Sequence, residues 1–149
     1  MTSSSKSRPE CFVNQWNCVA IALAYSLDIP YPDLITVIGH DGSEILWPSL
    51  SPPRCYKGFT PQDVLRAGLD LGIPIVHLKA TETLYGDTLQ TLCHSLDSYL
   101  DKYNGVVVGQ TDWGRHAMAI VDSKIMDVTR KGVVERDRNQ INVTDFFAM

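Results

Sequence analysis

The most distinctive pattern in the chain is an apolar run that directly follows Asn17 and Cys18. Residues 19–27 read Val-Ala-Ile-Ala-Leu-Ala-Tyr-Ser-Leu, which leaves almost no polar face on a helix. A helix that is apolar on every side is normally buried. Asn17 is a suitable N-cap, and Pro30 disfavours a helical conformation in the residue before it. We therefore expect a buried helix that starts at Cys18 and ends near Pro30.

Further signals predict a helical first half of the chain. Thr60-Pro61-Gln62-Asp63 combines a Thr cap, a proline at the first helical position and an acid at the third. It indicates a helix that runs to about Leu71, with Val64, Leu65 and Leu69 facing the core and Leu71 as a further candidate. Apolar residues at helical spacing predict another helix from Thr88 to Tyr103. The remaining expected elements are a short helix at 34–38, a loop at 39–43, an irregular segment at 45–58 and a strand at 73–78.

The hydrophobic period changes after Asn104-Gly105. Apolar residues now occur in short runs separated by turn residues, as is typical of strands. The predicted strands span 106–109, 116–121, 125–129 and 133–135, and a short terminal helix is expected at 144–147. Helices followed by an antiparallel sheet make an α+β fold. We expect one domain over residues 10–149 behind a flexible, Ser-rich tail of residues 1–9.

Composition and charge narrow the class of protein. The chain has 149 residues, of which 44% are hydrophobic and 20% charged, as in a globular domain. Its net charge of −4 and its lack of a Lys/Arg cluster argue against a nucleic-acid partner. No apolar run reaches the length of a membrane span, and the polar N-terminus does not match a secretory signal. We therefore expect a cytoplasmic protein that does not bind membranes.

Neither the cysteines nor the histidines suggest a metal site. The four cysteines occur without a C-x-x-C pair, at Cys11, Cys18, Cys55 and Cys93. This spacing fits neither a zinc site nor a disulfide scaffold, so we expect free thiols and no cofactor. The Gly-rich loop around His40, Asp41 and Glu44 is more typical of a turn than of a metal site. His77 and His94 have no partner that the sequence reveals.

Cys18 is the best candidate for a nucleophile. A helix N-terminus carries partial positive charge and unpaired N–H groups, and both stabilise a thiolate. A cysteine nucleophile also needs a base, and His116 stands at the start of a predicted strand. Taken alone, Cys18 could be a small buried side chain and His116 a hydrogen-bonded core histidine. Together with the polar residues before Cys18, they favour a catalytic site.

The register of a predicted hairpin suggests a third site residue, Asp127. If Asp122-Ser123 forms the turn, Asp127 lies diagonal to His116 on the same face of the sheet. If Ser123-Lys124 forms the turn, the face is the same but the distance is too long. A carboxylate near the imidazole would orient it, as in catalytic triads. Asp112 and Asp122 are the alternatives for this role.

These residues resemble the papain-like cysteine peptidase superfamily, most closely its compact bacterial and phage members. The similar features are a cysteine at the head of a buried helix, the late strand His116-Ala117-Met118-Ala119-Ile120-Val121, and a polar residue on the next strand. The resemblance implies a helical part, a sheet-rich part and a cleft between them. It also implies that Cys18 is the nucleophile, His116 the base and Asp127 the orienting residue.

The oxyanion donor departs from the family pattern. Papain-like enzymes place a glutamine about two helical turns before the cysteine, whereas here Gln15 and Asn14 directly precede it. Val19 also follows the cysteine where many members have other residues. Either Gln15 or Asn14 could donate to an oxyanion, as could the backbone N–H of Cys18.

The resemblance implies a cysteine hydrolase that cleaves a peptide, isopeptide or related amide bond of a peptide or protein substrate, through an acyl-enzyme and without a cofactor. A deamidase or acyltransferase would use the same triad, because only the acceptor differs. The alternative from another class is an inactive papain-like scaffold that binds a protein, as an inhibitor or host-directed factor. A third alternative is a metal-binding protein that uses Cys18 and His116.

Overall fold

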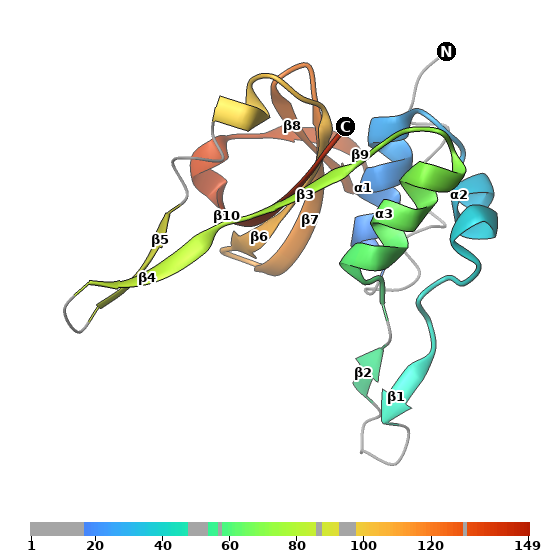
Figure 1. Cartoon of the computed structure of the whole chain (residues 1–149), viewed down its shortest axis with the longest axis horizontal. Helices are drawn as coiled ribbons and strands as arrows, with labels where there is room; N and C mark the ends of the chain where they lie inside the picture. The colour runs from blue at the N-terminus through green and yellow to red at the C-terminus, as the bar shows by residue number, and fades with distance from the viewer. Residues whose placement is uncertain (1–16, 48–53, 57, 86–87, 93–97, 130) are drawn as a thin grey trace.

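The computed structural model describes residues 17–47, 54–56, 58–85, 88–92, 98–129 and 131–149 (Figure 1). Three helices lie together beside a six-stranded sheet, and every strand of that sheet pairs antiparallel with its neighbours in the order β3-β10-β6-β7-β8-β9. This arrangement confirms the α+β class. The expected tail of residues 1–9 lies outside the described residues.

The elements have the following bounds. The helices are α1 (Cys18–Leu27), α2 (Tyr31–Ile38), α3 (Pro61–Asp70) and the 3-10 turn η3 (Arg138–Gln140), and residues 98–100 are also helical. The strands of the main sheet are β3 (Val76–Lys79), β6 (Gly105–Thr111), β7 (Gly114–Val121), β8 (Lys124–Thr129), β9 (Gly132–Arg136) and β10 (Ile141–Ala148). Two separate ribbons project from this body in Figure 1: β1 (Ile45–Trp47) with β2 (Arg54–Tyr56), and β4 (Thr81–Tyr85) with β5 (Thr88–Leu92).

Helix α1 is buried as the sequence predicts, and it packs against β6, β7 and β8. Its core positions, residues 20–24, are at most 2% exposed. Small side chains meet at this contact, because Ala20 and Ala24 share a core cluster with Ala117 and Ala119 of β7. Such small residues allow the helix backbone to approach the sheet closely. The close approach brings the N-terminus of α1 to the start of β7.

Helix α3 starts with the predicted capping box, and Val64 is buried in the core as expected, with Leu65 and Leu71 packed against it. Thr60 accepts from the backbone N–H of Asp63, and the Asp63 carboxylate accepts from the backbone N–H of Thr60. Leu69, which the sequence placed in the core, is 70% exposed. Gly68 is buried instead, since a Cβ there would come within 2.5 Å of the Ile73 carbonyl oxygen. The chain turns so tightly after α3 that only glycine fits against it.

Two helix predictions are wrong. Residues 88–92, expected at the start of a helix from Thr88 to Tyr103, form β5 and pair with β4. Residues 144–147, expected as a terminal helix, lie in β10 between β3 and β6. A β-bulge between Val143 and Asp145 interrupts the alternation of β10, which hides the period of two from a sequence reading. The segment 45–58, expected to be irregular, contains the β1–β2 pair.

In the described part of the chain no single helix has the length and apolar character to cross a bilayer, and only the pair α1 and α2, bent by 113°, passes that test jointly.

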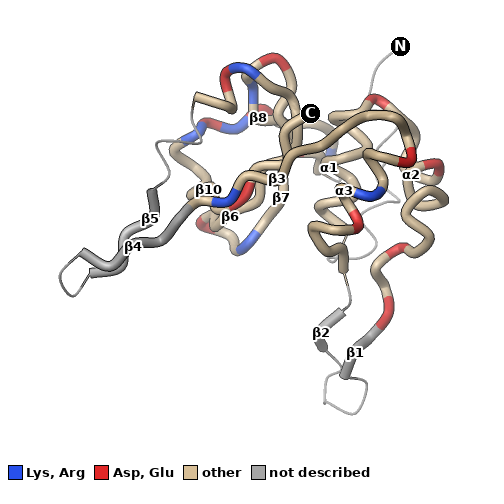
Figure 2. The backbone as a smooth tube through the Cα atoms, viewed as in Figure 1, with Lys and Arg blue, Asp and Glu red and all other residues tan. Residues whose placement is uncertain are grey.

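Charged positions of both signs lie around the sheet, on its strands and in its turns, and acidic positions also mark α2 and α3 (Figure 2). Among the described residues, two charged side chains are buried, namely Asp127 and Asp145. A buried carboxylate is costly unless it is paired and hydrogen-bonded. Both of these carboxylates contact a histidine, and one of the two histidines is His116.

Candidate active site

Cys18 is the first residue of α1 and is half-buried. The first turn of the helix contains no acid, and the N-cap residue Asn17 makes no capping hydrogen bond with its side chain. Instead the Asn17 side chain donates to the Tyr31 hydroxyl at 3.3 Å. The partial positive charge of the helix N-terminus is therefore not offset by a local carboxylate, and it acts directly on the Cys18 sulfur.

The predicted hairpin register is confirmed. Val121 pairs with Lys124, and both turn residues, Asp122 and Ser123, have positive φ values of 52° and 67°. Such a turn has the twist of a two-residue β-hairpin. Ala119 therefore faces Met126, which places Asp127 one position further along β8, diagonal to His116.

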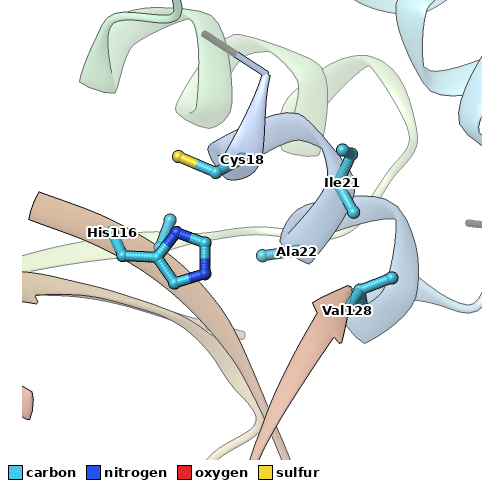
Figure 3. A pocket seen from close by; sticks show the side chains of 6 residues that line it. Cys18, Ile21, Ala22, His116 and Val128 are labelled. Carbon is cyan, nitrogen blue, oxygen red and sulfur yellow. The ribbon is translucent and has the colours of Figure 1, made fainter. Parts of the chain in front are cut away.

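His116 and Asp127 are joined by a hydrogen bond. His116 Nε2 lies 2.8 Å from Asp127 Oδ1. The Asp127 side chain is only 4% exposed, so this contact is shielded from water. With Nε2 held by the carboxylate, Nδ1 is the ring nitrogen left for a second partner. In Figure 3 the Cys18 sulfur points from the head of α1 toward the His116 ring.

Two residues that the sequence did not reveal complete the surroundings of Asp127. Arg136 of β9 donates from Nε to Asp127 Oδ2 at 3.1 Å, and its Nη2 forms an ion pair with the same oxygen at 3.0 Å. Its guanidinium lies 4.9 Å from the centre of the Trp113 ring. Trp113 in turn contacts His116 edge to face, with ring centres 6.4 Å apart. His116, Asp127, Arg136 and Trp113 thus form a closed ring of contacts.

The electrostatics favour a protonated imidazole. Burial lowers the pKa of His116, but hydrogen bonds with Asp127 and Cys18, together with their negative charge, outweigh it and raise the pKa to about 9. Burial raises the pKa of Asp127, whereas His116 and Arg136 lower it, and the net pKa lies below its ordinary value. At neutral pH the site therefore holds an imidazolium between a carboxylate and the cysteine sulfur. This charge arrangement is what a cysteine nucleophile requires.

A narrow pocket reaches this pair. It is lined by Cys18, Ile21 and Ala22 of α1, by His116 and Ala117 of β7, and by Val128 of β8 (Figure 3). Its walls are otherwise apolar, so few other polar groups compete for the sulfur and the ring. Low local polarity strengthens the electrostatic contact between the His116 ring and Asp127 relative to water.

The structure also places the other candidate residues. His40 Nδ1 accepts from the backbone N–H of Gly42, and its Nε2 contacts Asp63 at 3.1 Å, so both ring nitrogens are engaged within the protein. No group of three metal-binding side chains occurs among the residues described. Asp122 forms the hairpin turn, and Asp112 precedes Trp113. Asn14, Gln15 and His94 lie outside the described residues.

His77, which had no partner by sequence, contacts Asp145 at 2.7 Å. The pairing of β10 with β3 brings them together, since Phe147 lies opposite His77. The erroneous helix at 144–147 concealed this pair. Arg136 could have been found near Asp127 from the expected Lys131-Gly132 turn, but the observed register is shifted: Thr129 pairs with Gly132, which puts Val134 opposite Asp127 and Arg136 two positions away.

Three comparisons were made with known proteins. No protein-family model, no curated protein and no solved structure matches this chain.

Proposed function

We propose that the chain is a papain-like cysteine hydrolase that cleaves an amide bond in a peptide or protein. The observation that carries this proposal is the alignment of three groups: Cys18 at the N-terminus of α1, His116 beside it, and Asp127 bonded to the far ring nitrogen at 2.8 Å. A helix that carries the cysteine and packs on an antiparallel sheet that carries the histidine supports the papain-like assignment.

In the proposed reaction the Cys18 thiolate attacks the carbonyl carbon of the substrate. The resulting tetrahedral intermediate collapses as the carbon–nitrogen bond breaks, and the His116 imidazolium gives its Nδ1 proton to the departing amine. A thioester between Cys18 and the acyl group remains. Neutral His116 then takes a proton from water as the water attacks the thioester, which releases the acid and restores the ion pair.

Asp127 serves this cycle without becoming protonated. Its carboxylate holds the Nε2–H tautomer, so that Nδ1 faces Cys18, and it stabilises the imidazolium that starts each cycle. The backbone N–H of Cys18 is an oxyanion donor, with Gln15 and Asn14 as side-chain candidates. A deamidase or acyltransferase would differ only in the leaving group or the acceptor.

Labelling of the cysteines tests the proposal. We expect iodoacetamide at neutral pH to modify Cys18 at least tenfold faster than Cys11, Cys55 or Cys93, as read by peptide mass spectrometry. His116→Ala should reduce the Cys18 rate to that of an ordinary thiol, since the imidazolium that stabilises the thiolate is then lost. Cys18→Ser is the control that identifies the modified peptide.

A second assay measures the acyl-enzyme itself. With p-nitrophenyl acetate we expect a burst of one nitrophenolate per protein molecule, followed by slower turnover. The burst should disappear in Cys18→Ser. Labelling of Cys18 at the rate of the other cysteines, with no burst, would contradict the hydrolase and would favour an inactive scaffold that binds a protein.

A further inference from the structure

A second, larger hollow adjoins the candidate dyad. It has about 500 Å³ of empty space, part of which is open solvent. Val19, which follows Cys18, lines it on one side, and Arg115, which precedes His116, lines it on another. The hollow therefore contacts the chain neighbours of both the nucleophile and the base, although neither Cys18 nor His116 lines it.

Most of the wall of this hollow is apolar. Phe59 and Val64 line it from the α3 side, and Val108 and Phe147 line it from the sheet. Phe59 is held in place by stacking on His40, with ring centres 5.2 Å apart and planes inclined by 16°. Phe147 is stacked on His77 at 4.5 Å with an angle of 10°. Two fixed aromatic rings on facing walls suit an apolar or aromatic side chain.

The polar side of the hollow carries charges of both signs. Arg115 and Asp145 both line it, and Lys79 lies opposite Asp145 in the register of β3 and β10, on the same face of the sheet. Figure 2 shows basic and acidic positions side by side at this meeting of β3 and β10. Arg115 and Asp145 balance within the lining, and Lys79, which is not part of the lining, adds one positive charge beside it. An anionic group on a ligand would complement this positive charge.

The hydrogen bonds of Asp145 and Arg115 favour an anionic ligand over a cationic one. The Asp145 carboxylate already accepts from His77 and Thr144, each at 2.7 Å, and its side chain is 13% exposed. Arg115 uses Nη2 for its contacts with Thr144 and Asp145, at 3.2 and 3.4 Å, while its side chain is 58% exposed. A guanidinium has five N–H donors in a planar fork that suits a carboxylate. Arg115 can therefore bind a carboxylate, whereas Asp145 is engaged.

We propose that this hollow binds an apolar C-terminal residue of a peptide, with its side chain between Phe59 and Phe147 and its carboxylate on Arg115. The inference rests on the proposed hydrolase, in which this residue is the leaving group. Its amine departs toward His116, the chain neighbour of Arg115. The reaction class is thus the release of an apolar amino acid from a peptide or an N-acyl amino acid.

Four matched alkylating probes test the proposal: N-chloroacetyl-phenylalanine, its amide, N-chloroacetyl-glycine and its amide. In each reaction the Cys18 thiolate displaces chloride from the chloroacetyl carbon, which forms a thioether. We expect the phenylalanine acid to modify Cys18 at least tenfold faster than the phenylalanine amide and at least tenfold faster than the glycine acid. The first ratio measures recognition of the carboxylate, and the second measures recognition of the side chain.

Variants assign the carboxylate to Arg115. Arg115→Gln should bring the ratio of acid to amide close to one, and Arg115→Lys should restore part of it. The matched control is Arg138→Gln, because Arg138 pairs with Asp101 and does not line the hollow, and its ratio should stay unchanged. A wild-type ratio near one, or a ratio that Arg115→Gln leaves intact, would overturn the proposal.

A binding measurement separates this proposal from the hydrolase. N-acetyl-phenylalanine and its amide can be titrated calorimetrically into Cys18→Ala protein, where no reaction occurs. We expect the acid to bind at least tenfold tighter, and Arg115→Gln to remove the difference. Reactive Cys18 with no preference for the acid in either assay overturns the hollow alone. If Cys18 is unreactive but the acid still binds tighter than the amide, the hydrolase proposal is overturned and the carboxylate site is supported.

Discussion

Arg136 donates its Nε–H to one oxygen of Asp127, Oδ2, and pairs with that oxygen through Nη2, which leaves Oδ1 to His116. The carboxylate thereby has a fixed orientation, because each oxygen has its own charged partner. Arg136 lies on β9 and His116 on β7, on either side of β8. The strand order of the sheet therefore determines which way the His116 ring presents Nδ1.

We predict that Arg136 is a positioning residue. Its loss should lower both the free energy of unfolding and the rate of Cys18 alkylation. Arg136→Met should lower the free energy of unfolding by about 2–3 kcal/mol, because it leaves a buried carboxylate with one partner fewer. Urea denaturation measures this change. Arg136→Lys should recover only part of it, since an ammonium cannot reproduce the planar fork.

Arg138→Met is the matched control for that prediction. Arg138 also pairs with an aspartate, but its partner Asp101 is 63% exposed. An exposed pair of this kind contributes less than about 1 kcal/mol. Equal losses for Arg136→Met and Arg138→Met would contradict the positioning role, as would an unchanged rate of Cys18 alkylation in the Arg136 variant.

A second prediction concerns Asp127→Asn, which keeps an oxygen near Nε2 but removes the charge. Burial lowers the pKa of His116, and Asp127 is among the groups that raise it to about 9. Without the carboxylate, we expect the pKa of His116 to fall by more than one unit. NMR titration of the ring protons measures it, with His116→Gln used for assignment. A pKa that stays near 9 would show that Cys18 alone sustains the imidazolium.

The same variant should slow the alkylation of Cys18 at neutral pH, since fewer molecules then carry the imidazolium. Asp127→Ala should slow it further, because it also removes the oxygen that fixes the ring. Similar rates for wild type, Asp127→Asn and Asp127→Ala would mean that Asp127 does not act on the dyad.

The catalytic candidates could be predicted because each depends on a local pattern. The apolar run after Cys18 identifies a buried helix, and the Asp122-Ser123 turn sets a register that reaches Asp127 within one hairpin. Short-range patterns of this kind involve few alternatives. The alternative turn at Ser123-Lys124 was excluded only by the observed pairing of Val121 with Lys124.

The residues that sequence reasoning missed depend on contacts between distant segments. Asp145 meets His77 across 68 positions, and it does so only because β10 inserts between β3 and β6. The bulge in β10 interrupts the alternation of apolar and polar residues, so that the sequence of residues 144–147 is interpreted as a helix. Helical spacing likewise misassigned residues 88–92, where pairing with β4 overrides the pattern. The helix or strand propensity of a segment does not reveal which distant segment it pairs with.

A third prediction tests the central strands of the sheet through Gly109. This residue of β6 lies opposite His116 on one side and Val143 on the other. A Cβ at Gly109 would come within 2.1 Å of the Asn142 carbonyl oxygen. We therefore expect Gly109→Ala to force β6 and β10 apart and to cost about 3 kcal/mol of unfolding free energy.

Gly72→Ala is a useful comparison, because nothing lies within 4 Å of a Cβ at Gly72 and only its φ of +73° opposes the change. Strain of that kind costs about 1–2 kcal/mol. Thermal or urea unfolding measures both variants. A loss for Gly109→Ala no larger than that for Gly72→Ala would contradict the close approach of β6 and β10.

The last prediction is a pH dependence of stability that arises from His116. Burial lowers its pKa, yet Asp127 and Cys18 raise the folded-state pKa to about 9, against an unfolded value of 6.5. The folded protein thus binds this proton more tightly than the unfolded chain does. The contribution is complete below pH 6.5 and is lost as the pH rises through 9. Its size is on the order of 2–3 kcal/mol, reduced somewhat by the partial exposure of the ring.

A difference measurement isolates this contribution from other groups that titrate above neutral pH. The free energy of unfolding of wild type minus that of His116→Gln should be largest near pH 6 and should shrink steadily between pH 7 and pH 10. The decline should be weaker when the same subtraction is made in an Asp127→Asn background, because the carboxylate that holds the proton is then absent. A difference that stays constant across this range would mean that His116 is neutral in the folded protein at neutral pH, and the ion pair with Cys18 would have to be abandoned.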